Sequence, residues 1–193
     1  MDLVYAQHTP SDHSGLFGPI QEVEDDWQLI EGIPQLEDWP SDAYFEQDDE
    51  FGIRLDDAMK CSGGLMVISD TLRAALEAEL LSNVEMLPVT LLDLKKRPIQ
   101  TPYVLFHPIH PQDALDYEAS GAKPNAIDPD LVQSVERLAI REDALDPGVR
   151  VFRLAGYVDP IFFERSLAER LIAEGFTGIG FGEIDTYDPF SIF

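Results

Sequence analysis

The sequence contains a single cysteine, Cys61, among its 193 residues. One thiol cannot form a disulfide within the chain, and this composition fits a reducing compartment. The chain also lacks a run of about 18 apolar residues, which excludes a membrane-spanning helix. Its first ten residues, MDLVYAQHTP, lack the basic and apolar segments of a signal peptide. We therefore expect a cytoplasmic protein.

Basic residues are scarce: 13 Lys and Arg stand against 37 Asp and Glu, which gives a net charge of −24. Residues 1–53 contain no basic residue, although they carry 14 acids. A surface this negative repels nucleic acid and anionic lipid, so we expect neither as a partner. The same charge keeps the protein soluble and attracts cationic partners.

Motifs of common catalytic and cofactor sites are missing. The sequence has no G-x-S-x-G elbow, no P-loop and no calcium loop, and GIGFGE lacks dinucleotide-binding spacing. The closest approach to a ligand set is HPIHPQDALDYE, where His107, His110 and Asp113 recur every three residues, because histidine and carboxylate together can bind zinc. The proline after each histidine prevents a helix from presenting both on one face. We expect no metal, cofactor or catalytic residue, with a metal-dependent hydrolase as an alternative.

Two stretches of the chain share one pattern. VISDTLRAALEAELLSNVEM and FFERSLAERLIAEGFTGIGF align without a gap when Val67 is placed over Phe162. Each stretch predicts a strand, a helix and a second strand. The pair indicates an α+β fold with mostly antiparallel or mixed sheets, arranged as two related lobes or as a duplicated unit. Chance similarity between amphipathic segments is the alternative.

Apolar spacing indicates which helix faces are buried. The first helix, capped by Ser69 or Asp70, has three leucines on one stripe: Leu72, Leu76 and Leu80. The second helix, residues 166–174, ends at Gly175. Three of its residues are expected to face inward: Leu167, Leu171 and Ile172. Strands are predicted at residues 3–7, 84–94, 103–109 and 149–157, with Pro88 at a sheet edge or bulge.

Residues 1–60 are expected to form an acidic, aromatic-rich region packed on an α+β domain at residues 61–193. Most of its large rings should be packed, because they are too many for a free tail: Trp27, Trp39, Tyr44, Phe45 and Phe51. Acids interleaved with rings are typical of a protein-binding surface. The candidate partner-binding residues are Asp25, Asp26, Glu37, Asp38, Trp39, Glu46, Asp48, Asp49 and Glu50.

Four segments within about residues 60–182 follow one another in a familiar order: LMVISDTLRAALE, VEMLPVTLLD, PYVLFHPIHPQDALDYEAS and VRVFRLAGYVDPIFFERSLAERLIAEGFTGIGF. Together they resemble a family of bacterial immunity proteins from polymorphic toxin systems. The resemblance implies a non-enzymatic protein that neutralises a cognate toxin by stoichiometric binding in the cytoplasm, with the toxin encoded by a neighbouring gene. The acidity fits a basic toxin independently. An acidic scaffold protein without a toxin partner is the other alternative.

Overall fold

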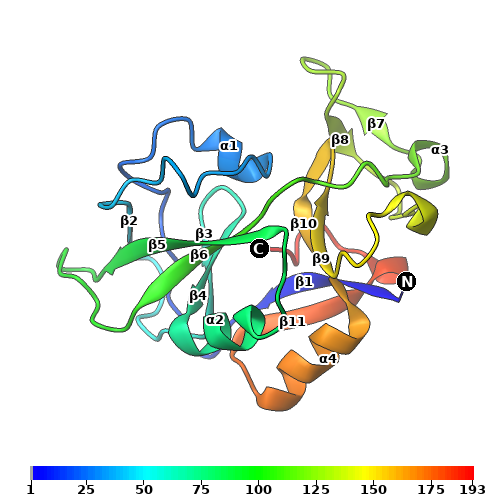
Figure 1. Ribbon diagram of the computed structural model, residues 1–193. Coiled ribbons are helices and arrows are strands. Elements are labelled where there is room, and N and C mark those ends of the chain that lie inside the picture. The colour runs from blue at the N-terminus through cyan, green and yellow to red at the C-terminus, as the bar shows by residue number, and fades with distance from the viewer. Residues whose placement is uncertain (1) are drawn as a thin grey trace.

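The computed structural model describes residues 2–193 and contains two main β-sheets (Figure 1). The five-stranded sheet has the order β2-β5-β6-β4-β3, with β2 (Tyr44–Glu46), β3 (Ala58–Cys61), β4 (Leu65–Ser69), β5 (Val84–Leu92) and β6 (Tyr103–Pro108). The four-stranded sheet has the order β11-β1-β10-β9, with β1 (Leu3–Thr9), β9 (Val151–Leu154), β10 (Tyr157–Glu164) and β11 (Gly178–Glu183).

Two helices and several short elements complete the fold. The helices α2 (Asp70–Glu77) and α4 (Arg165–Glu174) lie beside each other below the sheets in Figure 1. The short elements are α1 (Trp27–Ile30), α3 (Tyr117–Ser120), the ribbon of β7 (Lys123–Pro124) with β8 (Val132–Ser134), and 3₁₀ turns at Glu142–Ala144 and Ile184–Thr186. Among the described residues, no helix is both long and apolar enough to cross a membrane. The predicted α+β class is confirmed: the four-stranded sheet is antiparallel, and β2 runs parallel to β5.

The two aligned stretches form the same substructure in the two sheets. In β4-α2-β5 and in β10-α4-β11, both strands run antiparallel to one central strand, which is β6 in the first unit and β1 in the second. The register also agrees: Val104 on β6 lies opposite Ile68, and Val4 on β1 lies opposite Phe163, the residue aligned with Ile68. The two stretches therefore form a structural repeat with the same topology and register.

The central strands of the two units come from different places in the chain. β6 directly follows the first unit and lies between its strands β4 and β5, whereas β1 precedes the first unit but lies between β10 and β11 of the second. Residues 1–60 thus contribute one strand to the four-stranded sheet and two to the five-stranded sheet. The division of the chain at residue 60 stays a prediction.

Each sheet is buried on both faces. Residues from both sheets and both long helices form one shared core, in which the Phe106 and Phe163 rings are stacked with centroids 6.1 Å apart. Residues 10–57 cover the other face of the five-stranded sheet, where Leu29 and Phe45 are buried. Residues 109–150 cover the other face of the four-stranded sheet, where Leu115 is buried. Burial on both faces explains the nearly continuous apolar runs in several strands.

The predicted helix stripes are partly wrong. Ser69 caps α2 through a hydrogen bond from the Leu72 N–H, and Leu72 and Leu76 are buried as predicted. Leu80 is 86% exposed, because α2 ends before it and Leu80 adopts a positive φ of 54°. In α4, Ala168 takes the inward position instead of Ile172, which is 50% exposed. Gly175 ends α4 with φ 82°, as predicted.

Candidate partner-binding surface

The nine predicted partner-binding residues fall into two groups on the structure. The first group surrounds α1, and we call residues 21–42 the α1 surface. The second group follows β2 and lies beside the turn between β5 and β6. We call residues 46–55 and 93–99 together the hairpin surface. The α1 surface is acidic, whereas the hairpin surface is nearly neutral.

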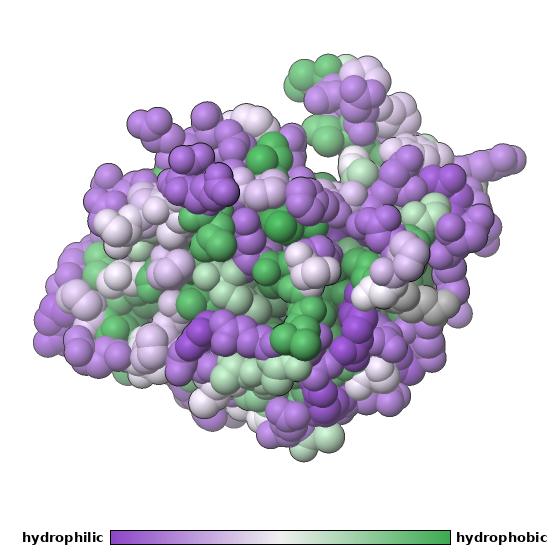
Figure 2. Space-filling view, in the orientation of Figure 1, coloured by the Kyte–Doolittle hydropathy of each residue, from purple (hydrophilic) through white to green (hydrophobic). Residues whose placement is uncertain are grey.

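The α1 surface is uniformly acidic. It carries eight acids and no base, and all eight side chains are exposed: Glu22, Glu24, Asp25, Asp26, Glu31, Glu37, Asp38 and Asp42. Within residues 2–193, none of these acids forms an ion pair. Figure 2 shows hydrophilic residues over α1 and its flanking loops. Their negative potential is therefore not neutralised locally.

The segment that carries these acids is fixed to the sheet below it. Leu29 in the short helix α1 is buried, and Gly32 accepts a hydrogen bond from the His110 N–H through its carbonyl. Gly32 has a positive φ of 68°, and a Cβ there would lie 2.9 Å from Pro111. The backbone N–H of Gln35 donates to Glu85 on β5 over 2.8 Å. The acids therefore stand on an anchored loop rather than on a free tail.

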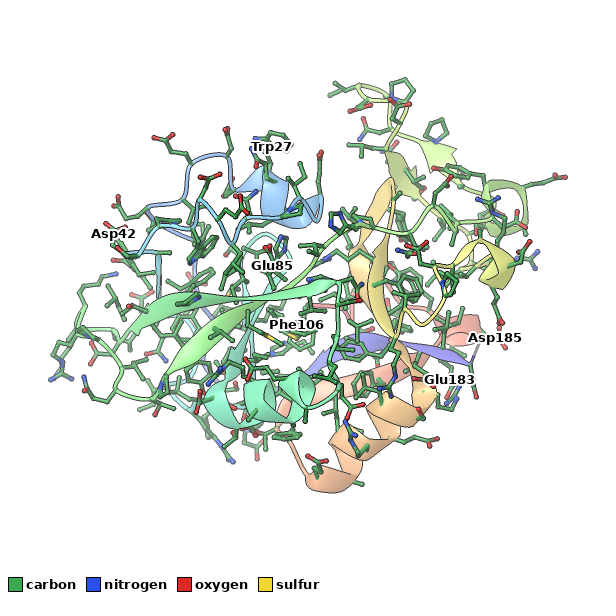
Figure 3. The ribbon with its side chains drawn as sticks, in the orientation of Figure 1. Trp27, Asp42, Glu85, Phe106, Glu183 and Asp185 are labelled. Atoms are coloured by element: carbon green, nitrogen blue, oxygen red, sulfur yellow. The ribbon has the colours of Figure 1, made fainter. Side chains whose placement is uncertain are left out.

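Apolar side chains and a groove accompany the acids. Trp27 is 48% exposed and Leu36 is 58% exposed. Trp27 lies on α1 in Figure 3, and its Nε1–H donates to Asp25 over 3.2 Å. A groove of about 450 Å³ is lined by Glu22, Val23, Glu24, Gln28, Gln35, Asp38 and Pro40. Carboxylates around a groove beside an exposed indole suit a Lys or Arg side chain of a protein partner.

The two tryptophans of this region differ in exposure: Trp27 is available to a partner, whereas Trp39 is held against the sheet. Trp39, which was among the predicted binding residues, is half-buried, and its Nε1–H donates to the Pro88 carbonyl over 2.7 Å. β5 is an inner strand of the sheet, but Pro88 lies beyond the residues that pair with β2, so the strand has a free edge there, as predicted for a proline. The sequence predicted that most of the large rings of this region are packed, and Trp27 was not among the candidate binding residues. Its flanking acids, Asp25 and Asp26, were the available signal for exposure.

The hairpin surface is nearly neutral. Five acids there accompany four bases: Glu46, Asp48, Asp49, Glu50 and Asp93 with Arg54, Lys95, Lys96 and Arg97. Lys96 forms a 2.6 Å ion pair with Glu46, and Arg97 forms a 2.6 Å ion pair with Asp93. The pKa of Asp93 is lowered to about 2 by hydrogen bonds from the Arg97 side chain and backbone. The acids of the second group are thus partly neutralised, unlike those around α1.

The three residues of the metal-site alternative lie in different surroundings. His107 is buried, and its Nε2 lies 2.9 Å from the Ile33 carbonyl oxygen. Burial lowers the pKa of His107, despite that hydrogen bond and the nearby Glu85 carboxylate. His110 and Asp113 are exposed, and Asp113 forms a 3.5 Å ion pair with Arg141. In the described part of the chain, no three His, Cys, Asp or Glu residues are grouped as metal ligands.

Comparison with known proteins matches nearly the whole of this chain to one family. Residues 6–186 match the sequence model described as Immunity protein family (Imm11). The match includes residues 6–9 of β1, the α1 surface and the hairpin surface. No curated protein matches the chain. The chain belongs to the Imm11 immunity protein family.

Proposed function

We propose that this protein binds a cognate bacterial toxin in the cytoplasm and neutralises it as a stoichiometric complex. Membership of an immunity protein family supports a toxin partner in general. The observation that carries the proposal is the α1 surface, with eight exposed carboxylates, no base and the half-exposed Trp27. The partner is a basic protein, encoded by a gene next to this one.

The chemistry of the α1 surface supports a basic protein partner. Unpaired carboxylates attract a cationic surface over about a Debye length, which raises the rate of encounter. Once the proteins touch, Trp27 and Leu36 offer the apolar contact that charge alone does not supply. The predicted binding acids of the second group, Asp48, Asp49 and Glu50, lie on the nearly neutral hairpin surface, so the attraction comes mainly from the α1 surface.

Blocking an active site requires binding but no chemistry in the inhibitor. A toxin that acts on nucleic acid needs a cationic cleft to hold its substrate, and an acidic protein can cover such a cleft. No catalytic residue, metal or cofactor is needed for this mode of inhibition. Each molecule of the protein would then inhibit one molecule of toxin.

Co-expression tests the proposal. Each neighbouring gene is expressed alone and together with this protein, and growth and co-purification are recorded. The proposal expects one neighbour to be toxic alone, growth to return on co-expression, and the two proteins to purify together. If no neighbour is toxic and none co-purifies, an acidic scaffold without a toxin partner becomes the better explanation.

A further inference from the structure

The hairpin surface combines exposed apolar residues with balanced charge. Ile53 is 70% exposed, Phe51 is 50% exposed and Leu94 is 41% exposed. Four of the 13 bases of the chain lie within this surface, next to five acids. The local charge is thus close to zero on a molecule whose net charge is −24. A basic toxin would gain little attraction here, so this surface calls for a different partner.

Two grooves adjoin each other on this surface. One, of about 360 Å³, is lined mainly by apolar residues and by the bases Lys95 and Arg97: Gln47, Ile53, Leu55, Asp93, Leu94, Lys95, Arg97 and Ile99. The charged residues that line the other groove, of about 340 Å³, are Glu46, Asp48, Asp49 and Lys96. Gln47 and Leu94 line both grooves. Two bases and one acid line the first groove, and three acids and one base line the second. The first lining is therefore net positive and the second net negative.

We infer that the hairpin surface binds a second copy of this chain in a two-fold symmetric dimer. A two-fold interface brings the same surface of both copies together, so that surface must complement itself. With Leu94 and Ile53 near the axis, the Lys95 side of one copy faces the Asp48 and Asp49 side of the other. Apolar contact at the centre and opposite charges at the edges are the usual arrangement of a protein interface.

Charge also explains why two copies would meet at this place. Molecules that each carry −24 repel each other, and the repulsion is smallest where the facing surfaces are neutral. Lys95 is available for a contact between copies, because it forms no ion pair within residues 2–193, whereas Lys96 and Arg97 are paired with Glu46 and Asp93. At about 0.15 M salt, charges beyond about 8 Å are largely screened, which favours association through short-range contacts.

The dimer leaves the proposed toxin-binding surface open. None of the eight acids of the α1 surface lines either groove. Each copy in the dimer could therefore bind one toxin molecule. The inference does not depend on the proposed function, because self-association is measured on this protein alone.

Sedimentation velocity of the purified protein, from micromolar to about 100 µM, tests the dimer. We expect a concentration-dependent shift from one copy to two. Ile53→Asp and Leu94→Asp place a charge in the apolar centre and should each raise the dissociation constant about tenfold or more. Ile127→Asp is the matched control, because Ile127 is 94% exposed and lies outside the hairpin surface.

Charge exchange distinguishes this interface from nonspecific association. Lys95→Glu and Asp49→Lys should each weaken the dimer, and the double variant should recover it, since the two positions face each other across the axis. Circular dichroism checks that each variant is folded. A wild-type protein that stays a single copy up to about 100 µM would overturn the inference, as would a dimer unaffected by both Ile53→Asp and Leu94→Asp.

Discussion

Asp57 and Arg150 occupy matching positions, just before the strands that pair with the first strands of the two repeated units, yet their charges are opposite. Each residue directly precedes the first strand of a hairpin, β3 or β9. Asp57 accepts a 2.8 Å hydrogen bond from Ser69 at the start of α2, and Arg150 donates to Glu164 at the start of α4. Each also reaches the other unit. Asp57 accepts from the Thr177 N–H over 2.9 Å, and Arg150 donates to Glu79 after α2.

Asp57→Ala should lower the free energy of unfolding by about 2–3 kcal/mol, because it leaves several donors around Ser69 and Thr177 without an acceptor. Urea unfolding followed by circular dichroism measures the change. Asp130→Asn serves as a control, since Asp130 is exposed and forms no ion pair within residues 2–193. An Asp57→Ala protein as stable as the wild type would show that this carboxylate does not hold the units together.

The contribution of Asp57 should depend on pH. Burial raises the pKa of Asp57, but hydrogen bonds from Thr177, Ser69 and Thr71 outweigh burial and hold the pKa below its ordinary value. A carboxyl group with a lowered pKa stabilises the fold above its unfolded pKa of about 4, and this stabilisation disappears as the pH falls through the folded pKa. The difference in unfolding free energy between wild type and Asp57→Asn should therefore shrink below about pH 4. A constant difference would contradict this account.

Arg150→Ala should cost about 1–2 kcal/mol of stability, because Arg150 bridges Glu79 and Glu164 from two different units. Arg73→Ala is a matched control. Arg73 also contacts two carboxylates, Asp70 and Glu77, but both lie on the exposed face of its own helix, so its loss should cost about 0.5 kcal/mol. Equal costs in urea unfolding would mean that bridging the units adds nothing.

The core that both sheets share, and the place of β1 between β10 and β11, predict that both units unfold together. Phe163→Ala, in the shared core, should cost about 3–5 kcal/mol. Phe163 lies in the four-stranded sheet, whereas Trp39 packs on the five-stranded sheet. Tryptophan fluorescence therefore reports on the unit that does not carry the substitution. Fluorescence and circular dichroism should show the same lowered midpoint, while Leu80→Ala, at an exposed site, should shift neither. A fluorescence midpoint unmoved by Phe163→Ala would indicate independent lobes.

Much of this architecture could be predicted from local sequence. Apolar periodicity and the Ser69 cap located both helices, and the gap-free alignment of Val67 with Phe162 indicated a duplicated unit. The place of β1 between β10 and β11 could not be predicted, because strand partners distant in sequence leave no local pattern. The prediction for Leu80 was wrong because the apolar spacing continues beyond the end of α2. The prediction for Ile172 was wrong because spacing alone does not show how wide the buried face of α4 is.

The candidate site was harder to predict than the fold. Composition located the acidic region but did not separate the unpaired acids around α1 from those beside Lys96. That separation depends on the turn between β5 and β6 lying next to residues 46–50 in space. Nor does composition distinguish an exposed tryptophan from a packed one. Trp39 is held by a bond to Pro88 on another strand, and Trp27 has no such long-range bond among those of the described residues.

Neutralising the acids of the α1 surface should slow association with the toxin. The triple variant Asp25→Asn, Asp26→Asn, Glu31→Gln should lower the association rate several-fold at low salt and reduce its dependence on salt, because long-range attraction is lost. The matched control neutralises three exposed acids elsewhere: Glu118, Asp130 and Glu169. Stopped-flow or surface-binding kinetics compare the two. An equal slowing in both variants would mean that only net charge matters.

The two tryptophans should respond differently to truncation. Trp27→Ala should weaken toxin binding by about 2 kcal/mol or more while leaving the unfolding midpoint nearly unchanged, since Trp27 is half exposed. Trp39→Ala should lower stability instead, because Trp39 packs on the core and bonds to Pro88. Titration calorimetry and urea unfolding separate the two effects. If Trp27→Ala bound the toxin normally, the α1 surface would lose its proposed apolar contact.

Titration of the toxin's activity with this protein tests the central claim most directly. A fixed amount of toxin receives increasing amounts of the protein, and the remaining activity is measured after equilibrium. Stoichiometric neutralisation predicts a linear fall that ends at one equivalent, with the residual activity constant in time. Full loss of activity at far less than one equivalent would reveal turnover by an enzyme, and undiminished activity beyond one equivalent would contradict neutralisation by binding.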